Sequence, residues 1–368
     1  MEELERLGLE TRVEPFTFND DLYGNVALHF GIGSLGTAVS GLSPHLGFVL
    51  HLLAGVSYWA DSTRRGYLLR RLLRFRPSQN VLATLPAEGE PALRVVLIAH
   101  ADAGPTGLLY NPRIVRLLTG ALPKPLAFME RSLAVATWSQ FVLAALDLTR
   151  IVLGPAGVVV RPVEHVVNLP GLIAAVVAAE VSLRREIVPG ANDNLSGVAA
   201  LPVLAARLAE SKRPDVELVF VVSGCEEASL GGADALAKAM ASRWDRERTV
   251  ILGLDSLANG DLVYLHPEGE VVPTPVPTWL IGAVEEVAVA SGVTVGSYQP
   301  PVGGSDVAAF MANGYDGLCL VGIDPELGAP RHNHLPTDVP ENLDMNALMS
   351  AIDFAEQLVG HIVSHRLG

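Results

Sequence analysis

The sequence contains few cysteines and few basic residues. Its 368 residues include two cysteines, Cys225 and Cys319, which are too few for the disulfide framework of a small secreted protein. Each lies in an apolar run, so we expect both to be buried free thiols. Lys and Arg number 26 against 40 Asp and Glu, which gives a formal net charge of −14. This acidity excludes a sequence-independent nucleic-acid binder, which needs a basic surface.

Charged residues make up only 18% of the chain, whereas hydrophobic residues reach 49%. Residues 25–60 contain no Asp, Glu, Lys or Arg, and the turn sequence Gly41-Leu-Ser-Pro-His45 divides them in two. The pattern predicts a helical hairpin. We expect residues 25–76 to form an insertion in the domain that the rest of the chain builds. A second insertion, 108–187, holds two more apolar segments. The charged residues that interrupt these segments are Asp147, Arg150, Arg161 and Glu164.

Each apolar segment has roughly 16 to 18 residues, the lower limit for crossing a hydrocarbon layer of about 30 Å. Two interpretations therefore remain open. The segments contact a membrane, or they form a helical subdomain that packs on itself, on the rest of the chain or on a second copy in a homo-oligomer. If they span a membrane, their basic flanks would keep the rest of the chain cytoplasmic. These flanks contain Arg64, Arg65, Arg70, Arg71, Arg74, Arg76, Lys124, Arg131, Arg184 and Arg185.

The N-terminus gives a second indication of location. Residues 1–5, Met-Glu-Glu-Leu-Glu, are acidic and lack the basic start and apolar core of a secretory signal. We therefore expect a cytoplasmic protein, and one held at the cytoplasmic face of the membrane if the apolar segments contact lipid.

The rest of the chain alternates between strand and helix patterns. Residues 1–24 and 77–107 begin this domain, and 188–368 complete it. The alternation is typical of a mainly parallel sheet covered by helices. The predicted strands are Arg94–His100, Glu217–Ser223, Val250–Asp255 and Gly317–Gly322, and the predicted helices are Asn194–Glu210, Ala233–Ser242, Trp279–Ser291 and Leu343–His365.

Ionisable residues follow several of these strands. His100 ends the first, with Asp102 two residues on, and Asp255 ends another. In open parallel sheets, ligands bind at the carboxyl ends of the strands. A His there suits a metal ion, and a nearby carboxylate can orient its imidazole. A buried acid such as Asp255 is costly unless it is paired or bound to metal.

Three further elements add carboxylates and an imidazole. Asp193 lies in a Gly-flanked loop that enters a helix, where a simple N-cap is the alternative. Glu226 and Glu227 follow a strand, so that one can bind metal while the other accepts a proton; an acidic helix start is the alternative. His334 is a candidate ligand, with Asp338 or a backbone carbonyl to orient it and His332 as its competitor.

The order of these elements resembles one family. His-x-Asp, Asp-Asn before a helix, Glu-Glu after a strand, Asp after the next strand and a late His-x-x-x-Asp are similar to the co-catalytic zinc peptidases, which include bacterial aminopeptidases and glutamate carboxypeptidases. Supporting matches are Ser78-Gln-Asn-Val81 and the segment 304–310, Gly-Ser-Asp-Val-Ala-Ala-Phe. The resemblance implies the three-layer zinc-exopeptidase fold, α/β with a mostly parallel mixed sheet and helices on both faces, to which this chain adds its apolar helical insertions.

The resemblance also implies the roles of the site residues. It assigns one Zn²⁺ to His100 and Asp255 and a second to Glu227 and His334, with Asp193 bridging the two ions; Co²⁺ or Mn²⁺ are substitutes. Asp102 would support His100, and Glu226 would be the general base. The implied substrate is a peptide, cleaved by water that the two ions activate.

The chain also departs from the family. Residues 103–190 separate the His-x-Asp element from Asp193, where family members have a short connection, so the substrate preference does not carry over. Two alternatives remain beside an aminopeptidase. One is a glutaminyl cyclase-like acyltransferase with a single zinc, and the other is a non-catalytic, membrane-associated module of the same fold. The complete ligand set and Glu226 favour the peptidase.

Overall fold

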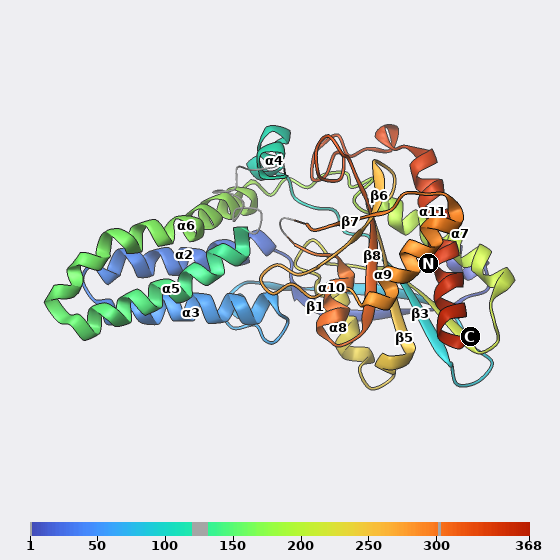
Figure 1. The fold of residues 1–368 in the computed structure, drawn as a ribbon, viewed down its shortest axis with the longest axis horizontal. Coiled ribbons are helices and arrows are strands. Elements are labelled where there is room, and N and C mark those ends of the chain that lie inside the picture. Colours follow the sequence, from blue (N-terminus) through green and yellow to red (C-terminus); the bar gives the residue numbers. More distant parts are fainter. Residues whose placement is uncertain (1, 120–131, 301–302) are drawn as a thin grey trace.

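The computed structural model describes residues 2–119, 132–300 and 303–368, so Lys124 and Arg131 of the predicted basic flanks lie outside the described residues. A sheet of eight strands forms the centre of one half of the molecule, and a bundle of four long helices projects from it (Figure 1). Both termini lie in the half that contains the sheet, far from the outer end of the bundle.

The sheet has the order β1-β2-β4-β3-β5-β8-β6-β7. Its strands are β1 (Glu10–Asn19), β2 (Phe75–Leu85), β3 (Leu93–His100), β4 (Val216–Ser223), β5 (Thr249–Asp255), β6 (Asp261–Leu265), β7 (Gly296–Tyr298) and β8 (Asp316–Ile323). The central strands β4, β3, β5 and β8 are parallel, whereas β1, β2 and β6 pair antiparallel with their neighbours in the order, apart from the parallel pair of β6 with β7. The predicted α/β fold with a mostly parallel mixed sheet is confirmed.

Helices cover both faces of the sheet. On one face lie α7 (Leu195–Ser211), α9 (Thr278–Ser291) and α11 (Met345–Leu367), and on the other lie α8 (Gly231–Met240) and α10 (Asp306–Ala312). Strand β3 is buried along its whole length between these layers. Its continuous apolar sequence is therefore typical of a strand that is covered on both faces. The short helix α1 (Glu2–Arg6) contacts β1 and α7.

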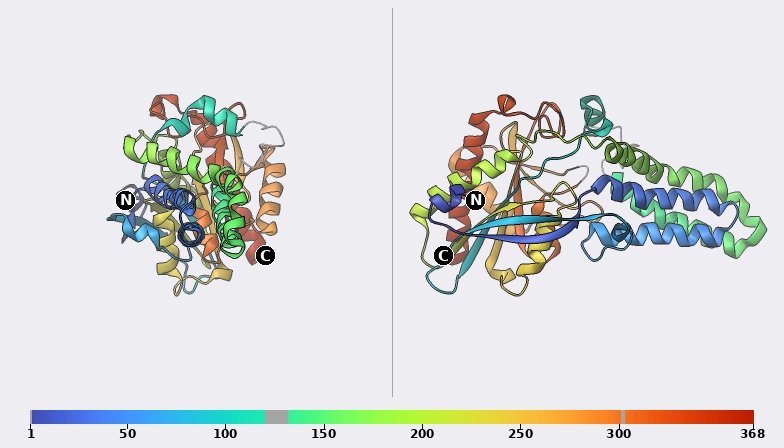
Figure 2. Two further views of the ribbon diagram at one scale, coloured as in Figure 1. Left: turned by 90° about the vertical axis from the view of Figure 1, so that its left-hand side faces the viewer. Right: turned by 180° about the vertical axis from the view of Figure 1, so that it is seen from behind.

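The bundle consists of two helical hairpins. The first is α2 (Leu22–Ser40) and α3 (Pro44–Ser62), which begin at side-chain caps from Asp21 and Ser43. The second is α5 (Ser132–Leu153) and α6 (Arg161–Arg184), joined by the 3₁₀ segment Gly154–Val160. The two views in Figure 2 show all four helices side by side, with both loops at the far end. The predicted first hairpin and its turn are confirmed, while α5 and α6 are longer than the apolar segments suggested.

Short elements connect these parts. They are the 3₁₀ segments Leu69–Leu72, Leu108–Tyr110, Arg246–Arg248 and Pro340–Asn342, together with α4 (Pro112–Thr119). Strands β6 and β7 at the sheet edge were not predicted, because they are short and β7 has no apolar run.

The core of the sheet should dominate stability. Leu97 in β3 is 0% exposed, and truncating a buried Leu costs about 2–5 kcal/mol in lost burial and cavity formation. We expect Leu97→Ala to lower the free energy of unfolding by this amount in denaturant titrations. The matched control Val289→Ala, on the 84% exposed Val289 of α9, should change it by less than about 0.5 kcal/mol. Equal effects would contradict the placement of the core.

Candidate metal centre

Adjacent strands bring most of the predicted site residues to one edge of the sheet. His100 is the last residue of β3 and Asp255 the last of β5, and Glu226 and Glu227 follow the end of β4. These three strands are parallel neighbours, so their carboxyl ends meet. Asp193 lies in the loop before α7, and His334 in the loop between β8 and α11.

Asp193 lies between the two histidines. Its Oδ1 atom is 3.2 Å from His100 Nε2, and its Oδ2 atom is 3.6 Å from His334 Nε2. His334 Nε2 is also 3.2 Å from Glu227 Oε2, and His100 Nε2 is 3.9 Å from Asp255 Oδ2. The structure therefore brings together all five residues that the sequence suggested as metal ligands, with one carboxylate facing both imidazoles.

Burial of these carboxylates and imidazoles makes their charged forms costly and shifts their pKa values. Desolvation raises the pKa of Asp255 to about 7 and raises the pKa of Glu226 well above its usual value. Burial alone would lower the pKa of His334, but the nearby Glu227 carboxylate outweighs it and raises that pKa to about 9. Neighbouring carboxylates thus repel one another and favour protons or cations between them.

Two buried atoms in the site lack a well-aligned hydrogen bond. His100 Nε2 faces Asp193 at 3.2 Å, but neither it nor Glu227 Oε1 makes a hydrogen bond of good geometry with a described residue. The ligand atoms of His100, Asp193 and Glu227 lie within 4.8 Å of one another, and so do those of His100, Glu226 and Asp255. Imidazole and carboxylate donors of this kind suit Zn²⁺. The two buried atoms and the chemistry of the donors therefore fit a metal site.

Backbone carbonyls orient both imidazoles. His100 Nδ1 donates to the carbonyl of Asp102 at 3.0 Å, and His334 Nδ1 donates to the carbonyl of Pro105 at 2.8 Å. Each ring thereby turns its Nε2 atom toward Asp193. Such a hydrogen bond on the far nitrogen is typical of metal-binding histidines. His332 instead bonds the Thr337 hydroxyl through its Nδ1 atom.

The carboxylates of Asp102 and Asp338 fix the loops that carry the candidate ligands. Asp102 accepts hydrogen bonds from the backbone N–H groups of Glu226 and Glu227, both at 3.1 Å, and its carboxylate is 3.8 Å from His100 Nδ1. It therefore supports His100 through its backbone carbonyl and fixes the Glu-Glu turn with its side chain. Asp338 accepts from the backbone N–H groups of Asn192 and Asp193 at 2.7 and 3.1 Å. It positions the Asp193 loop, whereas Pro105 orients His334.

A pocket of about 270 Å³ opens over these residues, lined among others by Asp193, Glu226 and Asp255. Tyr110 also lines it, and its ring stacks on His334 with centroids 4.0 Å apart and an angle of 2° between the planes. The Tyr110 hydroxyl bonds that of Tyr23 in the first turn of α2. Sequence reasoning missed both tyrosines, because Tyr23 lies just before the first predicted insertion, Tyr110 lies in the second, and neither belongs to a spaced pattern.

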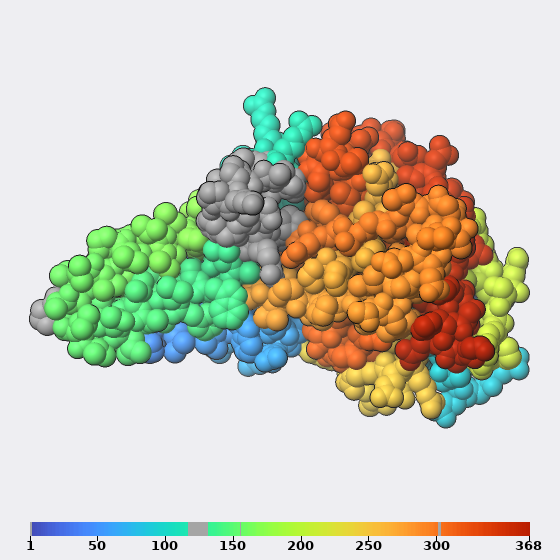
Figure 3. Space-filling model, in the orientation of Figure 1, coloured from blue at the N-terminus to red at the C-terminus, as the bar shows by residue number. Residues whose placement is uncertain are grey.

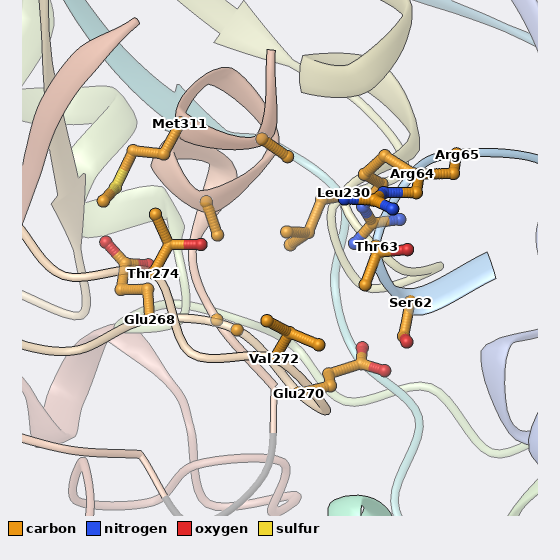
Figure 4. Close-up of a pocket in the computed structure, with 14 residues that line it drawn as sticks. Ser62, Thr63, Arg64, Arg65, Leu230, Glu268, Glu270, Val272, Thr274 and Met311 are labelled. Atoms are coloured by element: carbon orange, nitrogen blue, oxygen red, sulfur yellow. The ribbon is translucent and has the colours of Figure 1, made fainter. Parts of the chain in front are cut away.

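A second cavity, of about 260 Å³, adjoins the first and shares Leu230, Glu270 and Gly304 with it. Figure 4 shows Arg64 and Thr63 on one side of this cavity and Glu268 with Thr274 on the other. Glu268 is 0% exposed and accepts hydrogen bonds from the backbone N–H and the hydroxyl of Ser305 at 2.8 and 2.6 Å. Burial raises its pKa to about 7.

Together, the fold and the site combine a mixed α/β sheet with a cluster of side chains at its edge that suits metal ions. The family model described as peptidase family M28 matches residues 177–359, a segment that includes Asp193, Glu226, Glu227, Asp255 and His334. The match spans 183 of the 368 residues, so the chain is similar to this peptidase family over just under half of its length. No curated protein sequence matches it.

Solved structures share the fold at low sequence identity. A glutaminyl cyclase from Fimbriiglobus ruber has a TM-score of 0.52 and 12% identity, with 98% of this chain and 84% of that chain covered. One from Porphyromonas gingivalis has a TM-score of 0.50 and 12% identity, over 98% and 87%. A zinc aminopeptidase from Bacillus subtilis has a TM-score of 0.47 and 18% identity, with 78% of this chain and 52% of that chain covered. This chain thus spans about half the length of that aminopeptidase.

Removing the Asp338 carboxylate should weaken metal binding. We expect Asp338→Ala to lower zinc affinity by about 10- to 100-fold, because the Asp193 loop loses its support. Asp344→Ala is the matched control, since Asp344 also accepts two backbone N–H bonds, but at the start of α11, outside the loop that carries Asp193. It should reduce stability by about 1 kcal/mol and leave zinc affinity unchanged in competition titrations with a chelating dye. Equal affinities for both variants would contradict the role of Asp338.

Glu268 should make stability depend on pH. Its pKa is about 7 in the folded chain against 4.5 for an ordinary Glu, so its favourable contribution is complete below pH 4.5 and lost as pH rises through 7. A Glu268→Gln variant stays neutral. In metal-free protein it should gain stability over the wild type across this interval, on the order of 3 kcal/mol in total. Denaturant unfolding at several pH values measures this, and the exposed Glu285→Gln serves as control. A constant difference would contradict the buried carboxyl.

Proposed function

We propose that this chain is an aminopeptidase that uses two zinc ions. The observation that carries the proposal is the position of Asp193, whose two oxygens face His100 and His334 separately. One ion would be held by His100 and Asp255, and the other by Glu227 and His334, with Asp193 shared. When bound, such a pair of ions polarises a peptide carbonyl and lowers the pKa of a water molecule.

Glu226 acts as the general base in this proposal. Its neighbour Glu227 is fixed on the His334 side of the site, while Glu226 lines the pocket over Asp255. Its carboxylate is 3.9 Å from His100 Nε2, the same distance as that of Asp255. The distance to His100 therefore does not distinguish Glu226 as a base from Asp255 as a ligand. Glu226 is assigned as the base because it lies directly beside the ligand Glu227. Glu226 takes the proton of the attacking water and delivers it to the leaving amine.

The preference for a free N-terminus has its own support. Glu270 lines the pocket over the site and the cavity beside it, and its Oε2 atom accepts a hydrogen bond from Tyr58 at 3.0 Å. A carboxylate at this position suits the ammonium group of a peptide N-terminus. Apolar residues such as Leu109 and Leu265 line the same pocket and suit the side chain of the first residue.

A Glu226→Gln variant tests the base. We expect turnover of aminoacyl chromogenic substrates to fall by about 10²- to 10⁴-fold, because the proton acceptor is lost, while zinc content stays the same. Glu210→Gln, at the exposed end of α7, is the control and should keep full activity. Unchanged turnover in Glu226→Gln would overturn the assignment.

Metal content separates the proposal from its alternative. Elemental analysis of the active protein should give two zinc ions per chain, with loss of activity on chelation and recovery on adding zinc. One zinc per chain, together with cyclisation of an N-terminal Gln, would instead establish the glutaminyl cyclase-like reaction. This outcome has weight because two solved structures that share the fold with TM-scores of 0.50 or more are glutaminyl cyclases.

A further inference from the structure

The interior of the four-helix bundle contains buried ionisable groups beside a small apolar cluster around Phe30 and Tyr58. His51 donates through Nδ1 to Asp147 at 2.8 Å, and its Nε2 atom lies 3.0 Å from the Thr37 hydroxyl. A second pair joins Arg150 to Glu164 at 3.2 Å. Apart from Arg150, which is 8% exposed, these residues are at most 2% exposed. Ionisable groups thus occupy the place where a water-soluble bundle has its apolar core.

The outside of the bundle is apolar. Large hydrophobic side chains are exposed on all four helices, among them Leu35 on α2, Val49 on α3, Val142 on α5, and Ile173 and Val176 on α6. On the face shown in Figure 3, α5 and α6 are uncovered along most of their length. Exposed apolar area of this extent is rare on soluble monomers.

Small residues make the close contacts between the helices. A side chain at Gly33 or Gly171 would collide with Gln140, and one at Gly47 would collide with Asp147. Small residues at helix contacts and inward, paired ionisable groups are both typical of helices packed in lipid, where apolar burial does not drive association.

The helix lengths fit a bilayer. The four helices have 19, 19, 22 and 24 residues, which at a rise of 1.5 Å per residue gives about 28 to 36 Å. The hydrocarbon core of a bilayer is about 30 Å thick. By length and composition, α5 and the stretch Ala156–Arg184 qualify as membrane spans, and only 28% of the most apolar window of the latter is buried.

The two ends of the bundle differ. Near the sheet domain, the exposed basic residues include Arg65, Arg71, Arg74, Arg76, Arg184 and Arg185. Trp59 lies in the last turn of α3, under the guanidinium of Arg65 at 4.8 Å. Aromatic and basic side chains of this kind gather at the cytoplasmic interface of membrane proteins. The far end carries the exposed histidines His45 and His165.

We propose that the bundle spans a lipid bilayer as two hairpins, with the sheet domain on the cytoplasmic side. A second copy of the chain would cover one side of the bundle, whereas lipid covers all sides, and the exposed apolar residues occur on all four helices. Leu22, Tyr23 and Ser132, at the base of the bundle, also line the pocket over the candidate metal centre. The pocket therefore opens beside the membrane surface. The proposal does not depend on the peptidase reaction.

Membrane fractionation of the full chain tests insertion. We expect the protein to sediment with cell membranes, to remain there after washes in high salt and in alkaline carbonate, and to be released by detergent. Release by salt or carbonate would overturn the proposal. So would a soluble dimer in the absence of detergent, which would assign the apolar surface to a second copy.

Charges introduced on the outer face of the bundle provide a second test of insertion. Ile173 and Val176 lie near the middle of α6 and are 55% and 61% exposed. The double change to Arg should reduce the carbonate-resistant fraction roughly tenfold or more, because each Arg would face hydrocarbon. The matched control Val289→Arg, on the sheet domain, should leave that fraction unchanged. If the bundle faces water, all these proteins will fractionate alike, and the proposal fails.

Introduced cysteines test the orientation. A membrane-impermeant thiol reagent applied to intact cells should label Leu42→Cys, in the far loop, but not Val289→Cys. Ile173→Cys should react only after detergent is added. Labelling of Val289→Cys but not of Leu42→Cys would reverse the orientation and overturn that part of the proposal.

Discussion

The burial of four carboxylates beside two imidazoles is the constraint on which the site depends. Desolvation penalises each charged form, and repulsion between the acids adds to that cost. Without a cation, the cluster can keep its acids apart only by holding protons, as the raised pKa values of Asp255 and Glu226 show. Cations between the ligands remove this cost. Metal binding and stability of this edge of the sheet are therefore linked.

The fold meets this constraint through three neighbouring strands and two loops. The apolar sequences of β3, β4 and β5 place their carboxyl ends at one edge, which is why His100 and Asp255 could be predicted from the sequence. The roles of Asp102 and Asp338 could be predicted only in part. Both hold backbone N–H groups of distant loops, and such pairing depends on how those loops return to the sheet. No local spacing encodes it.

The lengths of the helices in the insertions could not be predicted from the sequence. Their apolar character was clear from the sequence, but the charged residues Asp147, Arg150 and Glu164 made each segment look shorter than the helix it forms. In the structure these side chains point into the bundle and pair with one another and with His51. A residue that interrupts hydropathy along the chain therefore need not interrupt the apolar outer surface. Tyr23 and Tyr110 could not be found either, since their contact joins the start of α2 to a distant segment of the second insertion.

The bundle and the site share structural support. Arg64 donates to the carbonyl of Ser229, and Arg70, paired with the buried Asp61 of α3, donates to the carbonyl of Ala228 at 3.3 Å. These carbonyls directly follow Glu226 and Glu227, so the base of the bundle holds one side of the Glu-Glu turn while Asp102 holds the other. In addition, Tyr23 of α2 bonds Tyr110, whose ring stacks on His334. Any shift of the bundle relative to the sheet would therefore displace both the Glu-Glu turn and the ring that stacks on His334.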